Sequence, residues 1–212
     1  MHLLSINIGK AQAINAKSGV TGIFKLPVHG PVAISREGLP GDAICDTESH
    51  GGVDQAVYVF GAPDYEHWSK VLGRDLAPGT FGENLTIAGL HSTDLNIGDM
   101  LHVGSVTLQV TAPRIPCVTL ATRMGDPSFV KLFRQVERPG VYCRVLQKGL
   151  VSAGDEVTME RYSGETVSAI EMFRNFYVPE RTEAMLRRYL RAPVAIRDRV
   201  EKQQQLDALL SK

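Results

Sequence analysis

Short alternating runs of apolar and polar residues, separated by glycine-rich turns, fill the chain up to about residue 160. Alternation with a period of two is typical of strands that bury one face. The G-x-G-x-x-G sequence of a dinucleotide-binding sheet is absent. The pattern therefore predicts a mainly β fold, a closed or rolled sheet with a few short helices. The strands are expected within residues 3–8, 31–35, 55–60, 85–87, 96–104, 106–111, 140–146 and 149–159, and the helices at 63–72 and 126–134.

The composition changes after Ser163 and Gly164, where helical periodicity interrupted by prolines replaces strand alternation. We expect a β domain followed by a small appendage of three helices. The expected domains are residues 1–163 and 164–212, and the expected helices of the appendage are residues 166–175, 180–191 and 194–210.

Arginines make this appendage locally basic. They are Arg181, Arg187, Arg188, Arg191, Arg197 and Arg199. Such charge permits an anion or nucleic-acid site, but helix faces on which glutamates intersperse with arginines are more commonly solvated. We therefore do not expect nucleic acid as a partner.

The overall charge and the cysteine content narrow the class of protein. Lys and Arg together number 23, as do Asp and Glu, so the whole molecule has no net attraction to nucleic acid or to an anionic membrane. Three cysteines at wide spacing, without C-x-x-C, favour a reducing, cytoplasmic compartment. The sequence shows neither a signal peptide nor an apolar run of about 18 residues, so no membrane association is expected.

The segment Thr111-Ala-Pro-Arg-Ile-Pro-Cys117 is the strongest candidate for a functional loop. Its two prolines stiffen the backbone and restrict the residues before them. Arg114, three residues before Cys117, would favour a thiolate if the two side chains converge. The alternative is a small buried core cysteine, and the sequence alone leaves both interpretations open.

Three other segments carry candidate site residues. Lys25 ends a glycine-rich stretch that is not a Walker A loop, and it is either an anion contact or a solvated lysine. In the loop 38–54, His50 is followed by Gly51 and Gly52, which would let the backbone approach a ligand closely. Acids surround this histidine, but the spacing does not favour zinc. At a loop-to-strand junction, Asn84 either faces a pocket or stabilises a turn.

An ordered set of short motifs resembles the MOSC family, named for the molybdenum cofactor sulfurase C-terminal domain. The motifs are Thr21-Gly-Ile-Phe-Lys25, Gly41-Asp42, His50-Gly-Gly52 with Asp54, Phe81-Gly-Glu-Asn84, Gly98-Asp99, Arg114-x-Pro-Cys117 and Ala153-Gly-Asp155. The resemblance covers residues 20–160 approximately, and the helical tail is similar to that of the YiiM-like branch. It implies a β-barrel-like fold related to the core of the mitochondrial amidoxime-reducing component.

The same resemblance implies a site for molybdenum cofactor, a molybdopterin. Cys117 would be the catalytic cysteine and the ligand of molybdenum, because a thiolate suits a metal already bound by sulfur. Lys25 and Arg114 would contact the phosphate and polar edge of the pterin. His50, Asn84, Gly51 and Gly52 would line the site.

The implied reaction is the two-electron reduction of N-hydroxylated compounds with release of water, on N-hydroxylated purine bases and as detoxification. Electrons would come from a separate reductase, because no flavin or iron-sulfur pattern is present. A homodimer is compatible with the sequence. A different hypothesis makes the protein a sulfur carrier for metallocofactor assembly, with a persulfide on Cys117.

Overall fold

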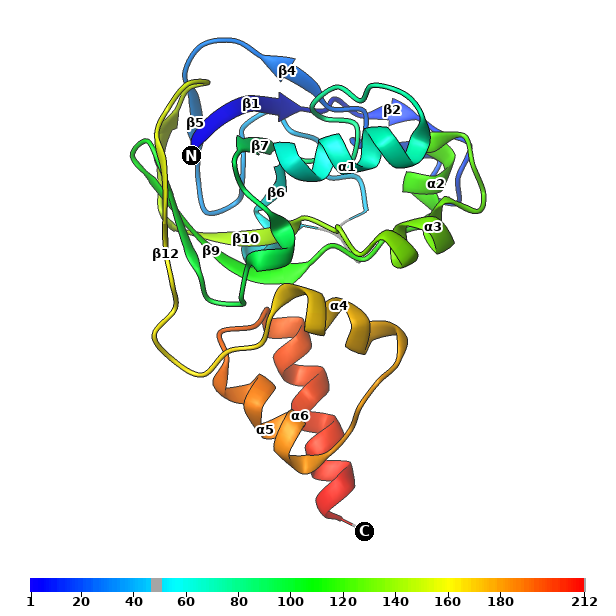
Figure 1. Cartoon of the computed structure of the whole chain (residues 1–212), viewed down its shortest axis with the longest axis vertical. Helices are drawn as coiled ribbons and strands as arrows, with labels where there is room; N and C mark the ends of the chain where they lie inside the picture. Colours follow the sequence, from blue (N-terminus) through cyan, green and yellow to red (C-terminus); the bar gives the residue numbers. More distant parts are fainter. Residues whose placement is uncertain (47–50, 212) are drawn as a thin grey trace.

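The computed structural model describes residues 1–46 and 51–211 and contains a strongly curved sheet of eight strands (Figure 1). The strands follow the order β12, β8, β9, β10, β6, β7, β1, β4, and every neighbouring pair is antiparallel except β6 and β7. Their bounds are β1 (His2–Ile8), β4 (Leu26–Val28), β6 (Val57–Gly61), β7 (Leu85–Ala88), β8 (Met100–Val103), β9 (Val106–Pro113), β10 (Val141–Gln147) and β12 (Val157–Glu160).

The sheet curls until the start of β1 reaches the segment before β12. A bridge joins His2 to Glu156, and the amide of Leu3 donates to the carbonyl of Asp155 over 2.9 Å. A continuous ladder does not run between β1 and β12. The predicted mainly β, rolled architecture is confirmed, with the barrel nearly but not fully closed.

Two smaller pairs of strands flank the large sheet. They are β2 (Gln12–Ala13) with β3 (Val20–Thr21), and β5 (Val32–Ile34) with β11 (Gly149–Val151). The adjacent strands expected within residues 96–104 and 106–111 form a hairpin: β8 and β9 are joined at Gly104 and Ser105, and Gly104 has φ of 54°, which a glycine adopts without strain.

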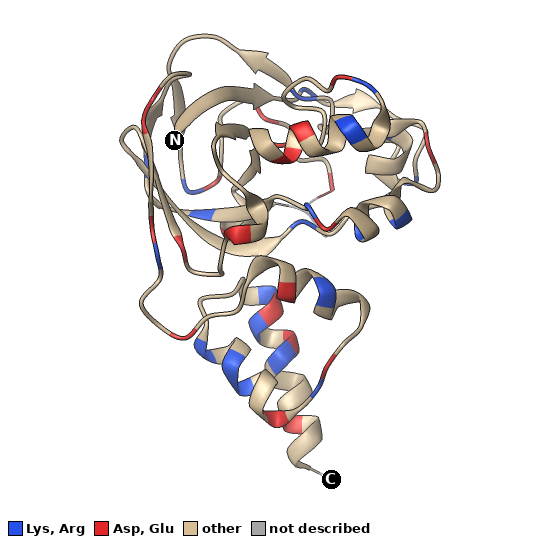
Figure 2. Cartoon of the chain, viewed as in Figure 1, with Lys and Arg blue, Asp and Glu red and all other residues tan. Residues whose placement is uncertain are grey.

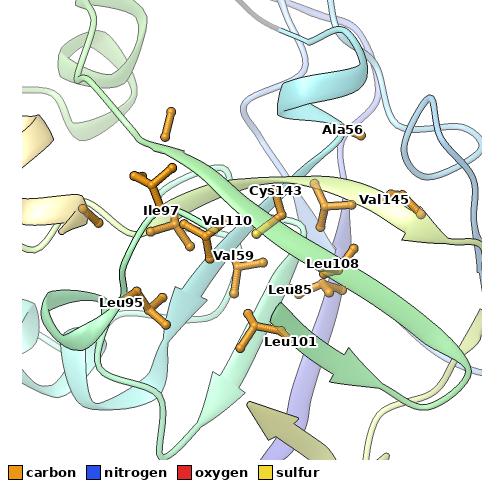
Figure 3. Close-up of a cluster of buried hydrophobic side chains, with 14 of the residues drawn as sticks. Ala56, Val59, Leu85, Leu95, Ile97, Leu101, Leu108, Val110, Cys143 and Val145 are labelled. Carbon is orange, nitrogen blue, oxygen red and sulfur yellow. The ribbon is translucent and has the colours of Figure 1, made fainter. Parts of the chain in front are cut away.

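Alternate side chains of the strands point inward and form the main core (Figure 3). Cys143 on β10 lies among Val59, Leu108 and Val110 with none of its surface exposed. Burial raises the pKa of its thiol far above the ordinary value, so the thiol stays protonated. Cys143 is therefore a small core residue.

Three helices cover one flank of the barrel with an aromatic core of their own. They are α1 (Ala62–Leu72), α2 (Val118–Met124) and α3 (Phe129–Val136), and the two short helices η1 (Val53–Gln55) and η2 (Ser92–Asp94) lie in loops. The indole of Trp68 on α1 lies 5.3 Å from the ring of Phe81 and 5.2 Å from that of Phe133. The helix expected at residues 63–72 is thus α1, and its aromatic face packs inward, whereas α2 was not predicted.

Three further helices follow β12 and lie together at one end of the molecule (Figure 1). They are α4 (Ala169–Tyr177), α5 (Glu183–Arg191) and α6 (Ile196–Leu210), close to the three predicted helices. The side chains of Ser168 and Thr182 cap α4 and α5 by accepting from the third following amide. The expected boundary at 163/164 falls in the segment between β12 and α4, although buried residues of both parts share one core.

The described helices include none that is both long and apolar enough to cross a membrane.

Candidate active site

Cys117 lies in the short connection between the long strand β9 and helix α2. The strand ends at Pro113, and Cys117 occupies the N-cap of α2 with φ of −126°. The carbonyl of Cys117 accepts from the amides of Leu120 and Ala121, over 3.1 and 3.2 Å. The residue is only partly buried, so its thiol belongs to a surface cleft and not to the main core.

A cleft on the barrel side of Cys117, which we call the barrel cleft, is lined by residues from six stretches of the chain: 18–25, 42–46, 51–58, 82–84, 114–119 and Tyr142. It brings together five of the predicted site residues: Lys25, Gly51, Asn84, Arg114 and Cys117. Gly52 is described but does not line the cleft, and His50 lies outside the described residues. Residues that are 92 positions apart in sequence, such as Lys25 and Cys117, thus face one space.

Gly51 and Gly52 both have a left-handed backbone conformation. The φ of Gly51 is 78°, and a Cβ at this position would meet the side chain of Ile44 at 3.0 Å. Gly52 has a similar φ of 79°, although a Cβ there would meet nothing within 4 Å. Both positions require a left-handed backbone, which explains the pair of glycines independently of any ligand.

Arg114 is a buried cation aimed at the barrel cleft. One of its terminal nitrogens donates to the carbonyl of Phe81 over 2.5 Å, and its guanidinium carbon lies 5.0 Å from the ring centre of Tyr58. Burial by itself would lower the pKa of Arg114, but the nearby phenol groups of Tyr142 and Tyr58 and the thiol of Cys117 raise it, so the charge is retained. The buried Nε of Arg114 has no acceptor among the described residues.

Lys25 and Asn84 meet at a shared carboxylate, that of Asp42. The ammonium of Lys25 forms an ion pair with Asp42, and the amide nitrogen of Asn84 donates to the same carboxylate over 2.8 Å. Asp42 also accepts from the backbone amide of Gly9 over 2.8 Å. Burial lowers the pKa of Lys25, and the charge of Asp42 opposes that shift. Lys25 thus reaches the cleft already partnered, with its position set by Asp42.

Asn84 also holds the wall of the cleft together. Its side-chain oxygen accepts from the backbone amide of Tyr58 over 3.1 Å. Asn84 therefore faces the cleft, as one of the two alternatives states, and the other end of its amide binds strand β6 and not a turn.

Glu83 lies beneath the cleft and does not line it. One of its carboxyl oxygens accepts from four groups: the amide of Gly79, the hydroxyls of Tyr65 and Thr86, and the side-chain amide of Asn7, over 2.6–3.4 Å. Burial raises the pKa of Glu83, and these donors oppose the shift. The carboxyl group therefore holds residues 79–86 in place, and this segment forms the cleft wall that contains Asn84.

A second cleft opens on the other side of Cys117, between the barrel and helices α4–α6. We call it the helix-side cleft. Cys117, Thr119, Tyr142, Gln55 and Asp46 line both clefts. Cys117 therefore stands at the junction of two spaces, one built by the barrel alone and one shared with the C-terminal helices.

Several residues of the site were missed in the sequence. Tyr58 and Tyr142 lie in strands, and the alternating pattern around them is typical of ordinary sheet packing. No neighbouring residue in the sequence indicates that their side chains line a cleft. Asp42 was considered only as one acid among several. Its place beside Lys25 follows from a contact across 17 positions, which sequence spacing does not reveal.

Within the part of the chain that the structure describes, no group of three or more His, Cys, Asp and Glu could hold a metal ion. The barrel cleft instead offers two thiols, the exposed Cys45 and the partly buried Cys117, together with two buried cations, Lys25 and Arg114. Such a set suits a negatively charged molecule that contributes soft ligands of its own.

Comparisons with known proteins find relatives that cover most of this chain. Residues 46–158 match the family model of the MOSC domain. The uncharacterized protein YflK of Bacillus subtilis is 42% identical over 154 residues, which cover 72% of this chain and 70% of that protein. A Gibberella moniliformis protein named Reductase is 31% identical over 162 residues, covering 74% of this chain but 29% of that protein. The crystal structure of YiiM from Geobacillus stearothermophilus superposes with a TM-score of 0.78 at 28% identity, covering 97% of this chain and 98% of that one.

Proposed function

The chain belongs to the MOSC domain family, and on that premise we propose that it is a molybdenum cofactor-dependent reductase of N-hydroxylated compounds. The relative from Gibberella moniliformis, named a reductase, supports the reaction class. N-hydroxylated purine bases are the substrates that we favour, in a detoxifying role in the cytoplasm.

The observation that carries this proposal is that Cys117 and the buried cation Arg114 line the same cleft. The buried Nε of Arg114 has no acceptor among the described residues, which is costly unless a ligand supplies one. A pterin phosphate or ring oxygen would satisfy this donor, and the guanidinium charge suits an anion. The residues present therefore fit the cofactor.

The cofactor would supply two-electron redox chemistry that the side chains of the cleft cannot supply. Cys117 would hold its metal as a thiolate, at a position set by the two prolines and the start of α2. Arg114 would bind its polar edge. Lys25 would offer a cation whose position Asp42 restrains.

In the proposed reaction the N–O bond of the substrate breaks. Two electrons and two protons are consumed, giving the amine and one water. The electrons come from a separate reductase, which is the partner that the reaction requires. The fungal relative is matched over 29% of its length, so most of that protein lies outside the shared region.

Elemental analysis of the purified protein tests the proposal. Wild type, Cys117→Ala and Cys45→Ala would be purified from a host that makes molybdenum cofactor, and the molybdenum per chain measured by mass spectrometry. Cys45 is an exposed thiol at the rim of the same cleft and serves as the matched control. We expect about one molybdenum per chain in wild type and Cys45→Ala, and almost none in Cys117→Ala.

Absence of molybdenum from the wild type, in a host whose cofactor synthesis is verified, would contradict the proposal. Cys117 would then be examined for a persulfide by mass spectrometry after incubation with a cysteine desulfurase. A persulfide at Cys117, absent from Cys117→Ala, would favour the sulfur-carrier hypothesis.

A further inference from the structure

The helix-side cleft places the C-terminal helices opposite the proposed reaction centre. Its barrel wall contains Cys117, Thr119 and Tyr142, and its opposite wall contains Arg197 and Asp198 at the start of α6. The barrel cleft, on the other side of Cys117, holds the residues suited to the cofactor. A substrate that approaches Cys117 without crossing the cofactor region would therefore occupy the helix-side cleft.

The first turn of α6 is fixed to the barrel by a small set of polar contacts. The carboxylate of Asp54 accepts from the amide of Ile196 over 2.6 Å, and its other oxygen lies 3.0 Å from Nε of Arg144. Arg144 on β10 also donates to the carbonyls of Pro193 and Val194, over 3.2 and 2.9 Å. This anchor sets the position of the cleft wall two residues beyond Ile196, at Asp198.

Asp198 lies in this anchored turn of α6, and its carboxyl group lines the helix-side cleft. The residue is only partly exposed. Among the described residues, no lysine or arginine forms an ion pair with it within 4.0 Å, whereas the other acid of this wall, Glu201, is 3.6 Å from Lys202. The carboxyl group of Asp198 is thus held in the cleft without an internal cation at contact distance.

We propose that Asp198 recognises the substrate, by pairing with an N–C–N edge such as that of an N-hydroxyamidine or an N-hydroxylated aminopurine. This inference rests on the proposed function and adds to it a specificity-determining residue outside the barrel. The two coplanar oxygens of a carboxyl group match two neighbouring nitrogens on a planar edge, which a simple hydroxylamine does not have.

The protonation of Asp198 is consistent with this role. Burial, followed by the nearby charge of Glu201, raises the pKa of Asp198 to about 6, while Lys202 and Arg197 oppose the shift. Asp54 lies close enough to raise it further. The group can therefore offer a donor and an acceptor to a neutral amidine, or two acceptors to an amidinium.

A pair of substrates tests the proposal on the full-length holoprotein with an efficient electron donor. N-hydroxybenzamidine carries the N–C–N edge, and N-phenylhydroxylamine lacks it. We expect Asp198→Ala to lower kcat/KM for N-hydroxybenzamidine at least about tenfold, mainly through KM, and to leave that for N-phenylhydroxylamine within about twofold. Asp198→Asn keeps one donor and one acceptor and should restore most of the activity. Asp207→Asn, an exposed change on the same helix, is the control.

An equal loss with both substrates would indicate a structural role and overturn the proposal, and so would an unchanged Asp198→Ala. If the wild type reduces neither substrate, the proposed function fails, and binding of the amidine product benzamidine by calorimetry still decides the inference. Binding that Asp198→Ala weakens at least about tenfold would support it. No binding, or equal binding by both proteins, would overturn it.

Discussion

The two walls that face Cys117 are built differently. The barrel wall rests on buried polar groups: the side chains of Asp42, Glu83 and Asn84 each join segments that are distant in sequence. The helix wall is more exposed, and Figure 2 shows basic and acidic residues interleaved along α5 and α6. Its arginines are largely committed to local pairs, such as Arg187 with Glu183 and Arg188 with Glu171.

This difference suits the two walls to different functions, the barrel wall to binding the cofactor and the helix wall to selecting the substrate. A buried hydrogen-bond network holds side chains at fixed positions, as binding of a large cofactor requires. The helix wall is joined to the barrel by only a few polar contacts, so residues that line it can be substituted without unfolding the barrel. We therefore expect barrel-wall changes to affect cofactor content and stability, and helix-wall changes to affect substrate preference.

Glu83→Ala should produce the largest loss of stability among these tests. It would leave the buried hydroxyls of Tyr65 and Thr86 and the amide of Gly79 without their acceptor. We expect the free energy of unfolding to fall by more than about 3 kcal/mol, with reduced molybdenum content. Chemical denaturation and elemental analysis would measure both effects.

Glu83→Gln is the matched control, because glutamine keeps an acceptor oxygen, and it also tests the raised pKa. Above the ordinary carboxyl pKa of 4.5, the folded protein retains a proton on Glu83 that the unfolded chain has released. Stability should therefore fall as the pH rises through this window in the wild type, more steeply than in Glu83→Gln. Parallel curves of unfolding free energy against pH would contradict the raised pKa.

Asp54→Ala should loosen the helix wall while leaving the barrel wall intact. The side chain of Asp54 is 14% exposed and caps the start of α6 as well as pairing with Arg144, so we expect a loss of about 2 kcal/mol. Molybdenum content should stay near that of the wild type, and KM for an N-hydroxyamidine should rise. Asp75→Ala, at an exposed site beyond α1, is the control. Loss of molybdenum from Asp54→Ala would contradict the proposal that the helix wall affects substrate preference and not cofactor content.

Tyr58→Phe should have a smaller effect, confined to one hydrogen bond. It removes the bond from the Tyr58 hydroxyl to the carbonyl of Pro139, 2.7 Å long, but keeps the ring beside Arg114. We expect a loss of about 1 kcal/mol in unfolding free energy and unchanged molybdenum content. A large drop in metal would show that the hydroxyl itself contributes to the cofactor region.

Arg187→Ala should have the smallest effect. Its ion pair with Glu183 is nearly half exposed on both sides, so a change of less than about 0.5 kcal/mol is expected by thermal or chemical unfolding. A loss comparable to that of Asp54→Ala would mean that surface pairs, and not the Asp54 anchor, hold the helix wall.

Local patterns in the sequence were sufficient to predict most of the strands and helices. Alternation predicted the long strands, including the two adjacent ones that form the β8–β9 hairpin, and the helical periodicity after residue 164 predicted α4–α6. The same kind of signal marked Cys117, because prolines and a nearby arginine act over a few residues. Helix α2 was missed, since its seven residues follow directly on a proline-rich segment that indicates extended backbone.

Which residues share a cleft was decided by the tertiary structure alone. The bond from the amide of Ile196 to Asp54 joins positions 142 residues apart, and it brings Asp198 to the space beside Cys117. Tyr142 lines both clefts because it lies on β10 between two strands, opposite Ala112 of β9 and Tyr58 of β6. Local propensity and spacing act over a few residues, whereas these contacts depend on how a curved sheet and three helices pack together.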